Sequence, residues 1–106
     1  MFCAHRSINN PIIGPTEENP WESLAAFNWC PIHEDGITKV VYRAMSASEV
    51  VDDKQLAMSV VGYAESKDGI EFEDRRPLVV PKESWEKFGC EDPRITKIDD
   101  TYYIFY

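Results

Sequence analysis

The 106-residue chain is poor in basic residues and has no long apolar run, and each shortage excludes a class of function. It has 11 Lys and Arg residues against 19 Asp and Glu, so the net charge is −8. Nucleic-acid binding needs clustered positive charge, and the basic residues here are scattered, so we expect no nucleic-acid partner. No apolar stretch approaches the ~18 residues of a membrane-spanning helix, so we expect no membrane partner.

Cysteine and histidine are also scarce. Cys3, Cys30 and Cys90 are widely spaced, odd in number and without a CxxC pair, which gives no support to a disulfide framework or a zinc site. His5 and His33 are isolated from one another, so we expect no metal and no bound cofactor. The N-terminal stretch MFCAHRSINN lacks the apolar core of a signal peptide. We therefore expect a cytoplasmic protein with three reduced, buried thiols.

Short segments rich in β-branched and aromatic residues dominate the rest of the chain and predict strands. They are Ala25–Ile32, Ile37–Ala44, Leu56–Ser66, Pro77–Pro81, Arg94–Ile98 and Thr101–Tyr106. Turn residues separate them at Asp35-Gly36, Asp68-Gly69 and Asp99-Asp100, and we expect Asp68 to be structural. The polar stretch Ser46–Gln55 is either a short helix or a surface loop.

The spacing of these segments predicts an all-β fold, because short strands every 8–12 residues or so indicate a sandwich, a barrel or a propeller. A propeller blade takes roughly 40–45 residues, so this length accommodates about two blades, whereas a closed ring needs at least about four. The sequence also ends within the apolar run TYYIFY. We expect residues 1–106 to be the N-terminal fragment of a single propeller domain.

The cluster Glu91-Asp92-Pro93-Arg94 concentrates opposite charges around a proline. A residue before proline is biased toward an extended backbone, so Asp92 is expected to project stiffly from the start of a strand. Taken alone, the cluster also allows Asp92 simply to pair with Arg94 or to cap a turn.

The segment GCEDPRI, followed by TYY and a β run, resembles glycoside hydrolase family 130, the β-mannoside phosphorylases and related mannosidases. Four further motifs of that family follow one another in order: NPIIGP (10–15), WESLAAFN (21–28), VVYRA (40–44) and GYAESKDGIEF (62–72). The resemblance covers the whole chain. It implies a partial five-bladed β-propeller, of which these residues would form about the first two blades.

The resemblance also implies roles for individual residues. Asp92 matches the catalytic acid, which donates a proton toward the glycosidic oxygen through a hydroxyl of the bound mannose. Asn28 and Arg43 match residues that hold the mannosyl unit. Arg94 and Glu91 resemble supporting residues, although Arg94 could equally bind substrate.

The alternation of VVYRA supports the placement of Arg43 in a site. It puts Tyr42 on one face of the strand and Arg43, with Val41, on the other. A charged side chain among apolar neighbours needs a partner such as a carboxylate or sugar hydroxyls, unless it reaches solvent at a strand end. Asn28 has the alternative role of a backbone hydrogen bond at a bulge. Trp29 departs from the small or proline residues typical after that Asn.

The family resemblance favours an inverting phosphorylase, in which inorganic phosphate attacks the anomeric carbon and releases mannose 1-phosphate. The expected partners are a manno-oligosaccharide or mannosyl-glucose and phosphate, and a homo-oligomer is compatible with these features. The phosphate-binding residues of the family would follow Tyr106. Two alternatives stay open: a β-mannoside hydrolase of the same fold, and a non-catalytic propeller fragment that binds carbohydrate or protein.

Overall fold

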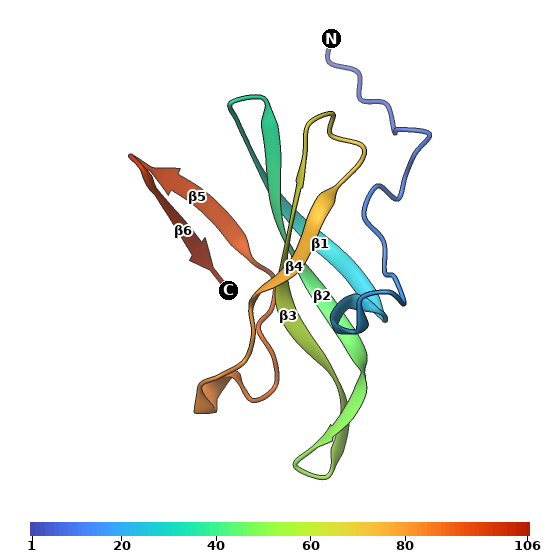
Figure 1. Cartoon of the computed structure of the whole chain (residues 1–106), viewed down its shortest axis with the longest axis vertical. Coiled ribbons are helices and arrows are strands. Elements are labelled where there is room, and N and C mark those ends of the chain that lie inside the picture. Colours follow the sequence, from blue (N-terminus) through green and yellow to red (C-terminus); the bar gives the residue numbers. More distant parts are fainter.

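The computed structural model describes residues 1–106 and shows an antiparallel all-β chain, which confirms the all-β part of the predicted fold class (Figure 1). One sheet of four strands has the order β1-β2-β3-β4, and β5 and β6 form a separate hairpin. The strands are β1 (Ala25–Glu34), β2 (Ile37–Val51), β3 (Lys54–Ser66), β4 (Glu73–Val79), β5 (Arg94–Ile98) and β6 (Thr101–Phe105). The helices are two single 3-10 turns, η1 (Pro20–Glu22) and η2 (Ser84–Glu86). Neither could cross a membrane.

The structure shows six strands and no propeller, so the expectation of about two blades stays a prediction. A four-stranded meander has the form of one blade, and β5 and β6 supply only two further strands. The hairpin and the N-terminal segment lie on opposite sides of the four-stranded sheet in Figure 1. The chain is open for its size: its radius of gyration is 15.0 Å, against about 13 Å for a compact domain of this length.

The predicted helix or loop at Ser46–Gln55 is wrong, because β2 and β3 continue through it as a long hairpin. Asp52 and Asp53 form the turn, with φ of 51° and 59°. Positive φ at both central residues matches the twist of a two-residue hairpin, and Asp tolerates it better than most residues. The predicted turn at Asp35-Gly36 is confirmed, with φ of 51° and 75°.

The four-stranded sheet buries a small apolar cluster on each face. The first cluster contains Val40 and Tyr42 of β2, with Ile13 of the N-terminal segment. The second contains Val41 of β2 and Val61 of β3, with Cys90 and the partly buried Ile95 and Ile104 of the hairpin. Because side chains alternate along a strand, β2 serves both clusters.

A buried polar network ties the N-terminal segment to the first face. The Glu22 carboxylate is fully buried and accepts hydrogen bonds from the Tyr42 hydroxyl at 2.8 Å and the Arg75 guanidinium at 2.7 Å. Asn19 donates to its other oxygen at 2.6 Å, and Arg75 also donates to the carbonyl of Gly14. Burial and the Glu22 carboxylate together raise the pKa of Tyr42, so its hydroxyl stays a donor.

Tyr42 also explains a glycine on the neighbouring strand. Gly62 lies directly opposite Tyr42 in the β2–β3 register. A Cβ at Gly62 would come within 2.7 Å of the Tyr42 ring and 2.9 Å of Trp21, which is closer than side chains pack. The Tyr42 side chain can therefore lie over position 62 and reach Glu22 only because that residue is glycine.

The segment between β4 and β5 is organised by Glu86. Its carboxylate accepts the backbone N–H groups of Lys82 at 2.7 Å and Glu83 at 2.9 Å, and the hydroxyl of Tyr106 at 2.7 Å. These donors lower the pKa of Glu86 from 4.5 to about 2. The Glu86 carbonyl in turn accepts the N–H of Gly89, so η2 fixes the start of the Glu91–Arg94 segment.

Replacement of Arg75 by Ala is expected to lower the free energy of unfolding by about 3–5 kcal/mol, because it leaves the Glu22 charge buried without its cation. Arg76→Ala is the matched control. Its side chain is 48% exposed and pairs with Asp74 at the surface, where a pair contributes about 0–1 kcal/mol. Urea unfolding of both variants measures the difference, and equal losses would contradict a stabilising role for the buried network.

Glu86 should add a pH-dependent part to the stability. A carboxyl with a depressed folded-state pKa stabilises the fold above its unfolded pKa, and this contribution disappears as pH falls from about 4.5 to about 2. Glu86→Gln should therefore be less stable than the parent at neutral pH, with the gap closing across this acidic window. Thermal unfolding at several pH values measures it, with the exposed Glu49→Gln as control. A gap that does not vary with pH would refute the assignment.

Candidate functional site

A bulge in β1 brings Asn28 to the site. The β1–β2 register shifts between Phe27 and Cys30, so β1 has one residue more than β2 there. Asn28 has a φ of 54°, a left-handed conformation that Asn adopts more readily than most residues. Its side-chain amide donates to a carboxylate oxygen of Asp92 at 2.7 Å. The sequence suggested either a structural role for Asn28 at a bulge or a role in the site. In the structure Asn28 lies at a bulge and its side chain also contacts Asp92.

Arg43 lies at the centre of the site. From the face of β2 opposite Tyr42, it donates through Nε to the Ser59 hydroxyl at 2.9 Å. Its two terminal nitrogens contact Glu91 at 2.7 Å and Asp92 at 3.4 Å. These contacts confirm the predicted alternation, and of the surroundings considered for Arg43 (a carboxylate, sugar hydroxyls or solvent) they show carboxylates.

Ser59 is the residue that sequence reasoning missed. It is fully buried on β3, and its carbonyl accepts the N–H of Cys90 at 2.9 Å, while its hydroxyl orients Arg43. Gly89, with φ of 121°, passes so close that a Cβ there would lie 3.0 Å from Ser59. The available signal was a small polar residue two positions before Val61, on the same face as the apolar residues of the second cluster.

The backbone of Asp92 differs from the prediction. Its φ is 48°, in the left-handed region, and not the extended conformation that a following proline favours. The contacts to Asn28 and Arg43 and the complete burial of Pro93 hold this conformation against the local bias. Asp92 thus turns back toward the edge of the sheet.

The environment of Asp92 stabilises its charged form. The hydrogen bond from Asn28 is the main cause that lowers its pKa below the ordinary range, and the hydrogen bond and charge of Arg43 act in the same direction. The side chain is nevertheless 53% exposed, whereas that of Arg43 is 18% exposed. The site therefore consists of a solvent-accessible carboxylate that contacts a largely buried guanidinium.

Arg94 is not part of this contact set. Its guanidinium donates to the carbonyl of Pro93 at 2.8 Å, and no ion pair joins it to Asp92. The structure thus overturns the alternative in which Asp92 serves as the ion-pair partner of Arg94. Asn28, Arg43 and Asp92 are brought together, with Glu91, and Arg94 lies beside them.

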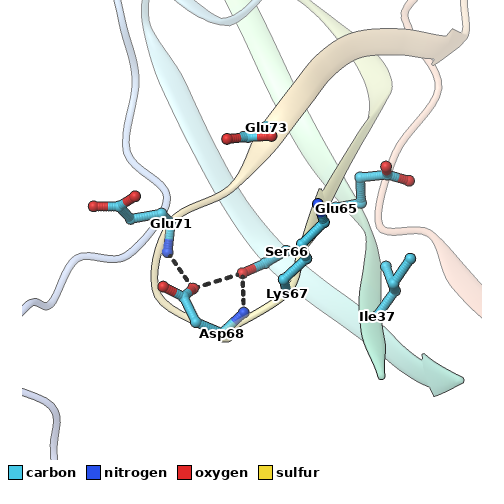
Figure 2. Close-up of a pocket in the computed structure, with 7 residues that line it drawn as sticks. All are labelled: Ile37, Glu65, Ser66, Lys67, Asp68, Glu71 and Glu73. Atoms are coloured by element: carbon cyan, nitrogen blue, oxygen red, sulfur yellow. Dashed lines mark hydrogen bonds between the residues drawn. The ribbon is translucent and has the colours of Figure 1, made fainter. Parts of the chain in front are cut away.

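A small pocket lies at the β3–β4 turn, and the hydrogen bonds of the turn account for its polar residues (Figure 2). Asp68 accepts the N–H groups of Ile70 at 2.8 Å and Glu71 at 2.9 Å, and Ser66 donates to it at 2.9 Å. These donors lower the pKa of Asp68. The structural role predicted for Asp68 is confirmed.

The thiols and the acidic residues do not form a metal centre: no group of three or more His, Cys, Asp or Glu residues is arranged to hold an ion. Cys90 is buried and Cys30 half-buried, but Cys3 is exposed, which corrects the expectation that all three are buried.

The chain is similar to known enzymes over its full length. It is 43% identical to the beta-1,2-mannobiose phosphorylase of Thermoanaerobacter sp. (strain X514), with 100% of this chain and 37% of the relative covered. It is 38% identical to the 1,2-beta-oligomannan phosphorylase of the same organism, with 100% and 36% covered. The chain thus spans little more than a third of the length of these curated relatives.

Solved structures share its fold. A glycosyl hydrolase from Bacteroides ovatus superimposes with a TM-score of 0.72 at 34% identity, over 93% of this chain and 32% of that one. The same values hold for a structure described with the finding that the family of mannoside phosphorylases contains hydrolases that target beta-1,2 mannosidic linkages in Candida mannan.

A family model provides the remaining comparison. Residues 12–106 match the model of glycoside hydrolase family 130, whose description is beta-1,4-mannooligosaccharide phosphorylase. This match includes four of the five motifs in full, the last four residues of NPIIGP, and the contact set of Asn28, Arg43 and Asp92. The chain therefore belongs to glycoside hydrolase family 130.

Proposed function

We propose that these residues form the N-terminal part of a propeller domain whose full-length protein is an inverting phosphorylase of β-mannosides. The observation that carries this proposal is the convergence of Asn28 and Arg43 on one oxygen of an accessible Asp92. Membership of a family with β-mannoside phosphorylases supports the substrate class, and curated relatives 38–43% identical are named for β-1,2-linked mannosides.

A longer propeller would provide what this sheet lacks. Large apolar side chains are exposed on the segment after β4 and on the β5–β6 hairpin, among them Trp85 at 77% and Phe105 at 65%. Contiguous exposed apolar surface usually marks an interface. Neighbouring blades of a ring would cover such side chains, and the relatives have the length to supply those blades.

In the proposed reaction Asp92 is the proton source. A phosphate oxygen forms a bond to the anomeric carbon while the glycosidic carbon–oxygen bond breaks, and the departing oxygen takes its electron pair. That oxygen receives a proton from Asp92 through a sugar hydroxyl. A donor and a nucleophile on opposite faces of the sugar give inversion.

The lowered pKa of Asp92 sets a condition on this chemistry, because a general acid must carry its proton when the bond breaks. Bound phosphate would bring negative charge near the carboxyl group and raise its pKa. Sugar hydroxyls that compete for Arg43 and Asn28 would weaken the two contacts that now favour the charged form. Substrate binding is thus expected to prepare Asp92 for proton transfer.

A hydrolase is the second candidate, because a structure of similar fold at 34% identity is described with hydrolases of this family. In that case water replaces phosphate, and glutamates beyond Tyr106 would supply the base. Asn28, Arg43 and Asp92 would keep their roles, since the sugar and the leaving group are the same.

Asp92→Asn in the full-length protein should lower kcat for a β-mannoside by about 10²–10⁴, the usual contribution of a general acid. The amide keeps the shape but cannot transfer the proton, so sugar binding and the melting temperature should change little. Asp100→Asn, in the exposed β5–β6 turn, is the matched control. A folded Asp92→Asn protein with nearly full activity would disprove the catalytic role.

Phosphate dependence separates the two candidates. The full-length protein should release mannose 1-phosphate from β-1,2-mannobiose only when inorganic phosphate is present, because phosphate is the attacking group. Chromatography of the products with and without phosphate measures this. Release of free mannose at an equal rate in phosphate-free buffer would instead identify a hydrolase.

A further inference from the structure

The Arg43 guanidinium is held through each of its three nitrogens by groups of this chain. Nε donates to the Ser59 hydroxyl at 2.9 Å, one terminal nitrogen contacts Glu91 at 2.7 Å, and the other contacts Asp92 at 3.4 Å. Its central carbon lies over the Phe27 ring, 5.2 Å from the ring centre. Arg43 therefore has a fixed orientation, with one positive charge beside two carboxylates.

The two carboxylates do not share that charge equally. The Glu91 contact, at 2.7 Å, is within the ~2.7–2.9 Å typical of charge-assisted hydrogen bonds. The Asp92 contact, at 3.4 Å, is longer than the ~2.7–3.2 Å of ordinary N–H···O hydrogen bonds. Glu91 is therefore the main counter-ion of Arg43, whereas Asp92 is held mostly by the Asn28 amide at 2.7 Å.

This division of the charge matters for a proton donor. A cation that serves one carboxylate alone lowers its pKa, whereas a second carboxylate nearby acts in the opposite direction. The groups that lower the pKa of Asp92 are Asn28 of β1 first, then Arg43 of β2 and the charge of Arg94 of β5. Glu91 limits the part due to Arg43, because it makes the closer contact with that guanidinium.

We propose that Glu91 is a positioning residue for the proton donor: it neutralises Arg43 and thereby allows Asp92 to take up and deliver a proton while Arg43 still holds the sugar. The proposal rests on the proposed function, because it assigns the proton transfer to Asp92. Glu91 acts through Arg43 and not on the reacting atoms. Removal of the Glu91 charge would leave Arg43 wholly to Asp92.

The test uses Glu91→Gln in the full-length protein, with β-1,2-mannobiose and phosphate as substrates. A general acid loses activity as pH rises through its pKa. Without the Glu91 charge the pKa of Asp92 falls, so the alkaline limb of the kcat profile should move to lower pH by about one unit. Above that limb kcat should fall about tenfold, and on the acidic plateau it should equal that of the parent. The KM for mannobiose should change little, since Arg43 keeps its hydrogen bond to Ser59.

Two further variants serve as controls. Glu91→Asp keeps the charge and should retain most of the parent's pH profile. Glu17→Gln makes the same charge change at an exposed residue of the N-terminal segment and should leave the profile unchanged. A loss of kcat by the same factor at every pH, with an unmoved limb, would give Glu91 a structural role only and overturn the proposal. A rise in KM alone would overturn it as well.

A titration without turnover separates this proposal from the proposed function. NMR of the full-length protein with isotope-labelled aspartate carboxyl groups follows the protonation of Asp92, whose signal is the one missing in Asp92→Asn. That signal should titrate at lower pH in Glu91→Gln than in the parent, and at the parent's pH in Glu17→Gln. This result in a protein that does not cleave mannosides would refute the proposed function but keep the role of Glu91. Phosphate-dependent cleavage with an unmoved titration would keep the function and refute the role of Glu91.

Discussion

The contact between Ser59 and the Gly89–Cys90 segment is the one on which the site depends. Ser59 holds the Cys90 N–H through its carbonyl and the Arg43 guanidinium through its hydroxyl. It therefore fixes, from one residue, both the cation of the site and the segment that carries its carboxylates. Gly89 permits this contact because a side chain there would meet the backbone of β3. This contact acts together with the Asn28–Asp92 hydrogen bond and the buried Pro93 to place Asp92 beside Arg43.

Strand β2 couples the site to the core through the alternation of its side chains. Tyr42 points into the first cluster and joins the buried Glu22 network, while Arg43 points to the other face and contacts both site carboxylates. A shift of this strand by one residue would exchange the two faces. The buried network therefore helps to keep Arg43 on the correct side, although it does not touch the site itself.

The surroundings of Asp92 keep its carboxyl group in the charged form. Asn28 and Arg43 both favour the charged form of Asp92, and the side chain remains accessible. If Asp92 is the proton donor, as we propose, bound sugar hydroxyls and phosphate would have to raise its pKa, because they would alter the same contacts. This arrangement would make proton transfer conditional on an occupied site.

The sequence by itself determined the β content, most strand positions and the turns at Asp35-Gly36 and Asp99-Asp100, because these features follow from local residue preferences. Alternation within VVYRA also separated Tyr42 from Arg43. The grouping of Asn28, Arg43 and Asp92 came from the family motifs, since Asn28 and Asp92 are 64 positions apart.

Only the tertiary structure decided the features that depend on distant partners. Ser59 gained its role from Gly89 and Cys90, which local preference cannot place beside it. The left-handed backbone of Asp92 opposes the preference set by Pro93, and contacts across the fold outweigh that preference. The polar stretch before Lys54 became a hairpin because pairing along β2 and β3 extends through it. Local chemistry specified the strands, whereas packing between strands specified the site.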